Sequence, residues 1–353
     1  MTEPATPTWQ LQFLQKYPSQ TGTSVWRAEA QARRGTHPDK TTAPALTTRT
    51  VVVKEEHPTG QNDRHNVARE AQLLQKLQHP HIISVLETYP VRFHDGQQGV
   101  RLVLPAGQCD LFDLVYRGHT RADPAGRCPA PQYWRHLEDV GRQILSALLY
   151  LHSEQVAHLD LSLENVVLFP TEQKQPPDVS VCAKLIDFGG AVHLQASVTR
   201  SVGKMGYMAP EFYVVEHKNN TFEASGSPHR LRLDLCDVFS LGALLFAAVT
   251  AQPPYQELVK KDGDGYPLLD LRAEPEYPYQ LTEEARRTLT QPWSQWWPDL
   301  KPMRDYQKES FRQYERHLEL AQVLDACLCL QPGKRKSLPE VAQLPWFQPR
   351  GAK

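Results

Sequence analysis

The sequence lacks an apolar run long enough to cross a lipid bilayer. Its longest mainly apolar stretch, Val238 to Ala251, is shorter than the roughly 20 residues of a spanning helix and predicts a buried core helix instead. The N-terminal Met-Thr-Glu-Pro has no basic-then-apolar secretory pattern, and Thr2 stands where N-myristoylation needs glycine. We therefore expect no membrane partner and a cytoplasmic location, with a nuclear one left open.

The sequence also lacks an excess of basic residues and any Cys-x-x-Cys pair. Lys and Arg total 39 against 40 Asp and Glu in 353 residues, so the net charge is −1 and nucleic acid is not an expected partner. The absence of a Cys-x-x-Cys pair argues against a disulfide framework or a zinc knuckle and predicts that the thiols are reduced. The six cysteines are residues 109, 128, 182, 236, 327 and 329.

The first third of the chain has the patterns of strands and one helix. Alternating residues predict a strand from Trp9 to Phe13, where Leu14 breaks the alternation. The β-branched run Val51–Lys54 predicts a second strand, and helical spacing from Asn66 is stopped by His79-Pro80. The polar segment from 31 to 49 predicts a surface loop. A strand over 102–104 then leads into a linker that begins at Pro105.

Helical patterns dominate the rest of the sequence. Apolar residues from Trp134 to Leu151 recur at helical spacing and predict one long amphipathic helix. The helix that begins near Asp237 is apolar on all sides, as a central buried helix would be. The segment from Gln256 to Arg316 is rich in Pro and Trp, and its structure is not predicted. The patterns indicate an α+β protein with a small strand-rich lobe and a larger helical lobe.

Three short motifs carry the chemistry. Asp160 is followed five residues later by Asn165, so a carboxylate can meet a substrate hydroxyl while a carboxamide holds a metal ion. Asp187-Phe188-Gly189 and Ala209-Pro210-Glu211 follow in order. The ordered set resembles the signature of the eukaryotic protein kinase superfamily. A single such motif is weak, but three in this order are specific.

The resemblance implies a bilobal protein-kinase-like fold in which residues 9–347 form one kinase domain. It implies a tail over 1–8, a small antiparallel-sheet lobe with one main helix over 9–104, a hinge over 105–109 and a larger helical lobe over 110–349. It also implies ATP and Mg²⁺ as cofactors and a protein substrate. The oligomeric state is not predicted.

The same resemblance implies roles for individual residues. Asp160 matches the catalytic base, and Asn165 and Asp187 match the Mg²⁺ ligands. Lys54 matches a strand lysine that contacts the nucleotide and pairs with Glu70. The implied cofactor-binding positions are Val25, Val52, Lys54, Glu70, Leu104, Ala106, Asp110 and Val167. Away from these positions, Glu211 matches a residue that pairs with Arg335, and Asp237 matches an aspartate that braces the catalytic loop, here residues 158–165.

Three departures from the family pattern leave two functions open. Aligned on Val25, the loop that should carry three glycines reads Pro18-Ser-Gln-Thr-Gly22-Thr-Ser-Val25. Its one glycine is out of place, which favours a pseudokinase scaffold with weak or no catalysis. Leu159 replaces an arginine that normally binds an activation-segment phosphate. Ser162 stands where the family has a lysine beside the catalytic base, and Lys204 stands where it has a small hydroxyl residue.

The exchange of Ser162 and Lys204 favours retained activity, because random loss would rarely restore a cation nearby. The resemblance therefore implies that Ser162 and Lys204 join Asp160 as catalytic residues, with Lys204 supplying the charge near the transferred phosphoryl group. The Leu163-Glu164-Asn165 ending and the segment before Ala209-Pro210-Glu211 resemble the serine/threonine class. The sequence thus predicts an ATP-dependent serine/threonine protein kinase, with the pseudokinase as the alternative. Asp110 and Glu164 also match acidic positions that meet a substrate arginine in many members of the family, which predicts a preference for one upstream basic residue.

Overall fold

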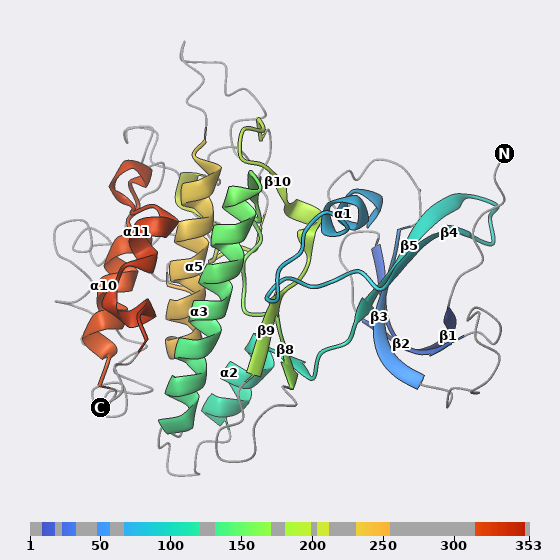
Figure 1. Ribbon diagram of the computed structural model, residues 1–353, viewed down its shortest axis with the longest axis horizontal. Helices are drawn as coiled ribbons and strands as arrows, with labels where there is room; N and C mark the ends of the chain where they lie inside the picture. The colour runs from blue at the N-terminus through green and yellow to red at the C-terminus, as the bar shows by residue number, and fades with distance from the viewer. Residues whose placement is uncertain are drawn as a thin grey trace, which may run out of the picture. The chain divides into compact units, whose positions relative to one another are not determined.

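The computed structural model describes residues 9–17, 23–32, 48–56, 67–120, 131–170, 181–198, 203–211, 231–254 and 315–349 (Figure 1). The chain divides into two compact units. The first comprises residues 1–108 together with 186–190, and the second comprises residues 109–185 together with 191–353. The first unit is rich in strands with one main helix, and the second is mainly helical, so the fold class is α+β as predicted.

The first unit is built on one antiparallel sheet of five strands in the order β1-β2-β3-β5-β4. The strands are β1 (Trp9–Tyr17), β2 (Thr23–Ala32), β3 (Thr48–Glu56), β4 (Glu87–Arg92) and β5 (Gln98–Pro105). Helix α1 (Val67–Leu74) packs against β3 and β5, and also against the short 3-10 helix η1 (Phe188–Gly190). The predicted strands at Val51–Lys54 and 102–104 are therefore confirmed within longer ones. Residues 33–47 of the predicted polar loop lie outside the described residues, while its two ends belong to β2 and β3.

The predicted end of the first strand at Phe13 is wrong, because β1 continues to Tyr17. Its pairing with β2 shifts register between Phe13 and Gln15, which marks a β-bulge at Leu14. A bulge inserts one extra residue, so the inward and outward positions change places after it. Leu14 is exposed. The break in the sequence pattern was the bulge and not the end of the strand.

Helix α1 is also shorter than its sequence pattern suggests. It ends at Leu74, before His79-Pro80. The amide of Gln75 still bonds to the carbonyl of Ala71, but that of Lys76 bonds only three residues back, to Leu73. This tightening of the last turn ends the α-helix. Apolar spacing continues past Leu74 because Leu77 is buried without being helical.

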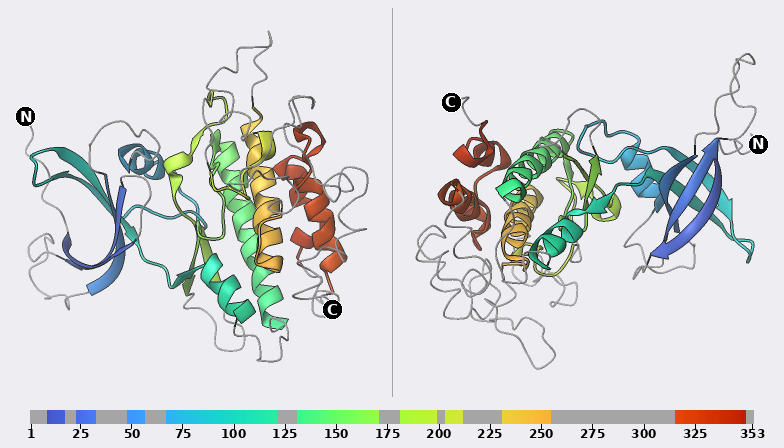
Figure 2. Two further views of the ribbon diagram at one scale, coloured as in Figure 1. Left: turned by 180° about the vertical axis from the view of Figure 1, so that it is seen from behind. Right: turned by 90° about the horizontal axis from the view of Figure 1, so that it is seen from below.

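The second unit contains helices α2 (Leu111–Thr120), α3 (Pro131–Ser153), α5 (Leu233–Thr250), α10 (His317–Cys327) and α11 (Leu338–Ala342). Helix α5 packs against α3, α10 and α11, and Figures 1 and 2 show α3, α5 and α10 lying next to one another. Short strands make two small sheets. They are β6 (Cys109–Asp110) with β8 (Val166–Pro170) and β9 (Val181–Leu185), and β7 (Val156–Ala157) with β10 (Val192–His193). The 3-10 helices η3 (Pro332–Lys334) and η4 (Pro345–Phe347) follow α10.

Helix α5 is the apolar centre of the second unit. It begins four residues before Asp237 and spans 18 residues of mean hydropathy 1.8, which is long and apolar enough for a membrane span by composition alone. The expectation that this stretch is too short is therefore wrong for the complete helix. The helix is nevertheless 94% buried inside the protein, so burial, rather than length, identifies it as a core helix. Of the segment whose structure the sequence did not predict, residues 256–314 lie outside the described residues.

The contact between α5 and α10 depends on a glycine. A Cβ atom placed on Gly242 would lie 2.6 Å from Cβ of Cys327 and 3.0 Å from the side chain of Leu328. We expect Gly242→Ala to lower the free energy of unfolding by about 1–3 kcal/mol through overpacking. This loss should outweigh the roughly 1 kcal/mol that alanine gains over glycine in a helix. Urea unfolding monitored by circular dichroism measures it.

Gly333→Ala is the matched control, because nothing lies within 4 Å of a Cβ atom at that position. It should leave the unfolding free energy nearly unchanged. Equal stability of the two variants would show that α5 and α10 do not pack as closely as described.

Candidate functional site

In the first unit, Lys54 is the centre of a buried charge cluster. Its ammonium lies 2.8 and 3.0 Å from the two carboxylate oxygens of Glu70 and 2.9 Å from Oδ1 of Asp187. Glu70 is 3% exposed, and its Oε1 also accepts the backbone N–H of Phe188 at 3.2 Å. The ion pair between Lys54 and Glu70 that the sequence predicted is present, and it extends to Asp187.

The strand and the helix place these groups for simple reasons. On β3, Val51 and Val53 are fully buried in the sheet core, so the alternate residues Val52 and Lys54 point to the opposite face. Glu70 lies in the buried stripe of α1, which packs against β3 and η1. Burial alone would lower the pKa of Lys54, but the charges of Asp187 and Glu70 outweigh it and raise that pKa above its usual value. The lysine therefore stays charged.

Asp187 has an unusual backbone. Its φ is +60°, in the left-handed region that non-glycine residues seldom adopt. Such a conformation costs on the order of 1–3 kcal/mol and persists only where surrounding contacts fix it. Two contacts fix this conformation. Lys54 donates to the carboxylate of Asp187, and Glu70 accepts the N–H of the next residue, Phe188. The carboxylate is thus held in one place while its side chain remains 31% exposed.

The predicted nucleotide-binding residues of the first unit lie on the same sheet. In the register, Val25 pairs with Lys54, and Val52 pairs with Leu104. Val52 is only half-buried, although the valines on either side of it are fully buried, so the Lys54 face of β3 retains accessible apolar surface. Ala106 follows β5 and is half-buried. Residues 18–22 of the altered glycine loop lie outside the described residues, and its last three residues, 23–25, belong to β2.

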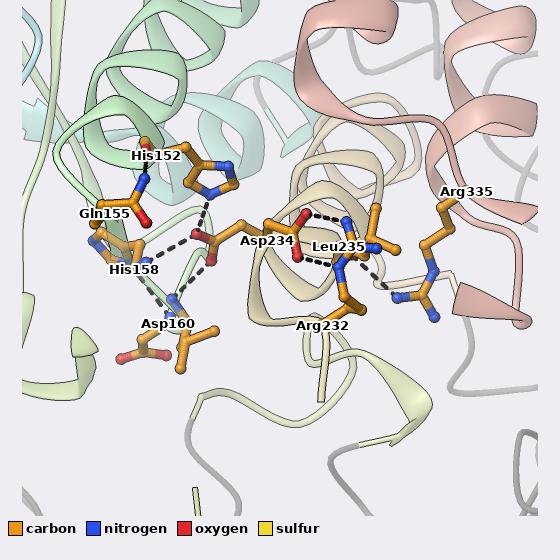
Figure 3. A network of polar contacts seen from close by, with 10 residues as sticks. His152, Gln155, His158, Asp160, Arg232, Asp234, Leu235 and Arg335 are labelled. Carbon is orange, nitrogen blue, oxygen red and sulfur yellow. Dashed lines mark hydrogen bonds and ion pairs between the residues drawn. The ribbon is translucent and has the colours of Figure 1, made fainter. Parts of the chain in front are cut away.

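In the second unit, Asp237 on α5 binds the backbone of the catalytic loop. Its buried carboxylate accepts the backbone N–H of His158 at 2.9 Å and of Leu159 at 2.8 Å, and it lies 2.9 Å from Nε2 of His152 (Figure 3). Leu159 is buried with φ of +64°. The bracing role expected for Asp237 is therefore seen, and it fixes a strained backbone. The sequence analysis missed His152, because no spacing rule connects it with a residue 85 positions away.

The loop is closed by its own polar groups. Nδ2 of Asn165 donates to the carbonyl of Asp160 at 2.7 Å, and the amide of Asn165 bonds to the carbonyl of Ser162 at 3.2 Å. With Nδ2 used in this way, the Oδ1 oxygen of Asn165 is the atom left for a cation. Mg²⁺ prefers oxygen ligands and needs few from the protein when it binds through phosphates. The carboxamide oxygen of Asn165 is therefore a ligand of the kind that the metal implied by the sequence prefers, and so, in the first unit, is the carboxylate of Asp187.

The remaining predicted site residues also lie in the second unit. Asp110 ends β6 immediately before α2, its Oδ1 accepts the amide of Asp113 at 2.7 Å, and Val167 pairs with it across β6 and β8. Ser162 is 2% exposed. Lys204 is exposed and forms an ion pair with Glu164. The catalytic roles of Ser162 and Lys204 stay predictions.

A second buried ion pair holds the Ala209-Pro210-Glu211 motif. Arg335 binds Glu211 through two hydrogen bonds, Nη1 to Oε1 at 2.5 Å and Nη2 to Oε2 at 2.7 Å. This pairing was predicted. The thiol of Cys236 donates to the same carboxylate at 3.3 Å, and Arg335 also reaches backbone carbonyls, including that of Leu235 (Figure 3). Burial would lower the pKa of Arg335, but the charge of Glu211 outweighs it and raises that pKa.

Replacing Asp237 tests the bracing of the loop. In Asp237→Asn the carboxamide has one acceptor oxygen, and its NH₂ group faces donors. We expect a loss of about 1–3 kcal/mol in stability. We also expect amide hydrogen exchange at His158 and Leu159 to accelerate by at least about tenfold. Hydrogen exchange read by mass spectrometry or NMR measures it.

Asp234→Asn is the control, because Asp234 lies three residues earlier on the same helix and pairs with the exposed Arg232. It should leave the exchange of both loop amides unchanged. Unaltered exchange in Asp237→Asn would mean that the loop is held by other contacts.

The comparison with known families agrees with this geometry. The chain matches the protein kinase domain family over residues 41–347. It is 30% identical over 233 residues to the serine/threonine-protein kinase RAD53 of Saccharomyces cerevisiae, covering 62% of this chain and 24% of that protein. It is 26% identical over 255 residues to cyclin-dependent kinase 8 of Caenorhabditis elegans, covering 70% and 38%.

A third relative is the SNF-related serine/threonine-protein kinase of Rattus norvegicus, 30% identical over 192 residues, which covers 54% of this chain and 21% of that protein. The alignments thus span less than two fifths of the length of each of these relatives. The match of the family to more than half of the chain, together with the Lys54 cluster and the braced catalytic loop, shows that the chain belongs to the protein kinase family.

Proposed function

We propose that this chain is an active ATP-dependent, Mg²⁺-requiring protein kinase that phosphorylates serine or threonine. The observation that carries the proposal is the buried ammonium of Lys54, which Glu70 and Asp187 share. Because this lysine is already ordered, it can contact phosphate oxygens without a further loss of side-chain conformational entropy. Phosphoryl transfer depends mainly on such preorganised charge.

Each remaining group has one task in this proposal. When bound, ATP supplies the transferable phosphoryl group and Mg²⁺ neutralises its charge. Asn165 and Asp187 would supply oxygen ligands to the metal, and Lys54 would bind the phosphates. Asp160, on a loop that Asp237 fixes, orients the hydroxyl of the substrate and takes its proton. The residues that would bind the nucleotide are Val25, Val52, Leu104 and Ala106 in the first unit and Asp110 and Val167 in the second.

The serine/threonine class is supported by two observations. Two of the relatives given above are serine/threonine-protein kinases by name. The segment from Gly203 through Tyr207 to Glu211 resembles the same class in sequence. The alternative is a pseudokinase scaffold. It is favoured by the altered glycine loop, whose only glycine is Gly22. The strained backbone of Asp187 argues against this alternative. Lys54 and, through the amide of Phe188, Glu70 maintain a conformation that costs free energy and has no use without a ligand.

Two alanine variants separate nucleotide binding from turnover. Asp187→Ala removes a metal ligand and should abolish Mg²⁺-dependent nucleotide binding. Asp160→Ala should leave that binding intact and lower turnover by about 10²–10⁴-fold, as the loss of a positioned base does. Calorimetric titration with ATP and a peptide phosphorylation assay measure the two effects.

Asp95→Ala is the control for these variants, because Asp95 lies in the exposed turn between β4 and β5. It should behave as the unchanged protein does. Full activity in both Asp187→Ala and Asp160→Ala would refute the kinase assignment, whereas intact binding without any turnover in the unchanged protein would favour the pseudokinase.

Regulation by activation-segment phosphate should be weak. Leu159 is buried and uncharged where the family pattern has a phosphate-binding arginine, and Val192 stands at another usual cation position. The candidate phosphorylation sites between Asp187-Phe188-Gly189 and Ala209-Pro210-Glu211 are Ser197, Thr199 and Ser201. Ser197 is exposed, and the other two lie outside the described residues. We expect phosphatase treatment to change the rate of peptide phosphorylation little. Loss of most activity would indicate that another basic residue, for example Arg200, binds the phosphate.

A further inference from the structure

The catalytic loop exposes few of its side chains. Of the residues from His158 to Val166, only Asp160, Glu164 and Asn165 reach solvent, and the others are buried. An extended substrate advances about 3.3 Å per residue. A peptide whose hydroxyl reaches Asp160 therefore has neighbouring residues within reach of Glu164, four positions along a loop that Asn165 closes.

Glu164 has only one oxygen for an incoming cation. Its Oε2 is shielded from solvent and has no hydrogen-bond donor among the residues that the structure describes. Any cation that approaches from solvent must therefore bind Oε1. The ammonium of Lys204 already holds that oxygen as an ion pair. A substrate arginine or lysine would have to displace it.

Lys204 is held in this position by its surroundings. The backbone amides of Tyr207 and Met208 both bond to its carbonyl at 3.1 Å. The preceding Gly203 has φ of +113°, and a Cβ atom there would lie 2.5 Å from the carbonyl oxygen of Leu159, so this segment lies directly on the catalytic loop. The ammonium is also 5.9 Å from the centre of the buried Tyr207 ring. The backbone that carries Lys204 is thus fixed next to Glu164.

We propose that Lys204 occupies, within the same chain, the position that a basic substrate side chain would take at Glu164. This proposal rests on the proposed kinase function. The protein then does not distinguish serine or threonine peptides that carry an arginine or lysine opposite Glu164 from those that carry none. The preference for one upstream basic residue, expected from the sequence, is replaced by indifference to it. Because the pair is partly exposed, with 48% of the Lys204 and 33% of the Glu164 side chain accessible, its removal has a moderate effect.

The test compares peptides that differ at one residue. Each has a single serine, with either arginine or glutamine at one of five upstream positions. The unchanged protein should phosphorylate the two members of each pair at similar rates. Lys204→Met keeps the length of the side chain and removes its charge. It should raise the arginine-to-glutamine rate ratio by roughly three- to tenfold at one position.

Three further variants assign this gain to the pair. Glu164→Gln and the double change Glu164→Gln with Lys204→Met should both keep the ratio near one, because the acceptor charge is gone. Lys334→Met removes an exposed lysine elsewhere in the same unit and should behave as the unchanged protein does. A strong preference for arginine in the unchanged protein would overturn the proposal.

The rate ratio also separates this role from a catalytic one. If Lys204 instead stabilises the phosphoryl group, Lys204→Met should slow every peptide equally and leave the ratio unchanged, which would contradict the proposal. Peptide affinities measured by fluorescence anisotropy need no turnover and should show the same three- to tenfold change. Absence of phosphorylation together with this affinity change would refute the kinase function alone. Unchanged affinities, or no peptide binding by any variant, would refute the substrate proposal.

Discussion

The shared ammonium of Lys54 is the interaction on which the chemistry of this chain depends. A buried cation is costly unless it is paired and hydrogen-bonded. Glu70 and Asp187 meet both needs, and neither could remain in place without the lysine. Removing Lys54 would leave two carboxylates without a compensating cation. The cluster joins a strand, a helix and the Asp187-Phe188-Gly189 turn, three segments that lie far apart in the sequence.

The helical unit uses the same principle with different groups. Buried carboxylates of Asp237 and Glu211 accept several donors each, and through them α5 supports the catalytic loop and the end of the Ala209-Pro210-Glu211 motif. The side chains placed for chemistry, Asp160 and Asn165, are themselves partly exposed. Rigid buried networks thus hold loops whose functional groups remain accessible to ligands.

The sequence predicted those features that depend on local pattern or on motif order. The strand at Val51–Lys54 and the long helix before His158 follow from residue type and spacing. The pairing of Lys54 with Glu70 follows from the resemblance to protein kinases. The errors arose where tertiary structure changed a local rule. Leu14 broke an alternation because the strand bulges, and α1 ended early because its last turn tightened. The pairing of Lys204 with Glu164 could not be predicted, since it depends on how close Gly203 lies to Leu159.

Catalytic competence is the central claim, and transfer of labelled phosphate tests it most directly. The full chain would be incubated with ATP labelled at the γ-phosphate and peptides whose only acceptor is serine, threonine or tyrosine, with Mg²⁺ or with a chelator. We expect label on serine or threonine, none on tyrosine, and none with the chelator. Nucleotide binding without any transferred label would contradict it and identify a pseudokinase.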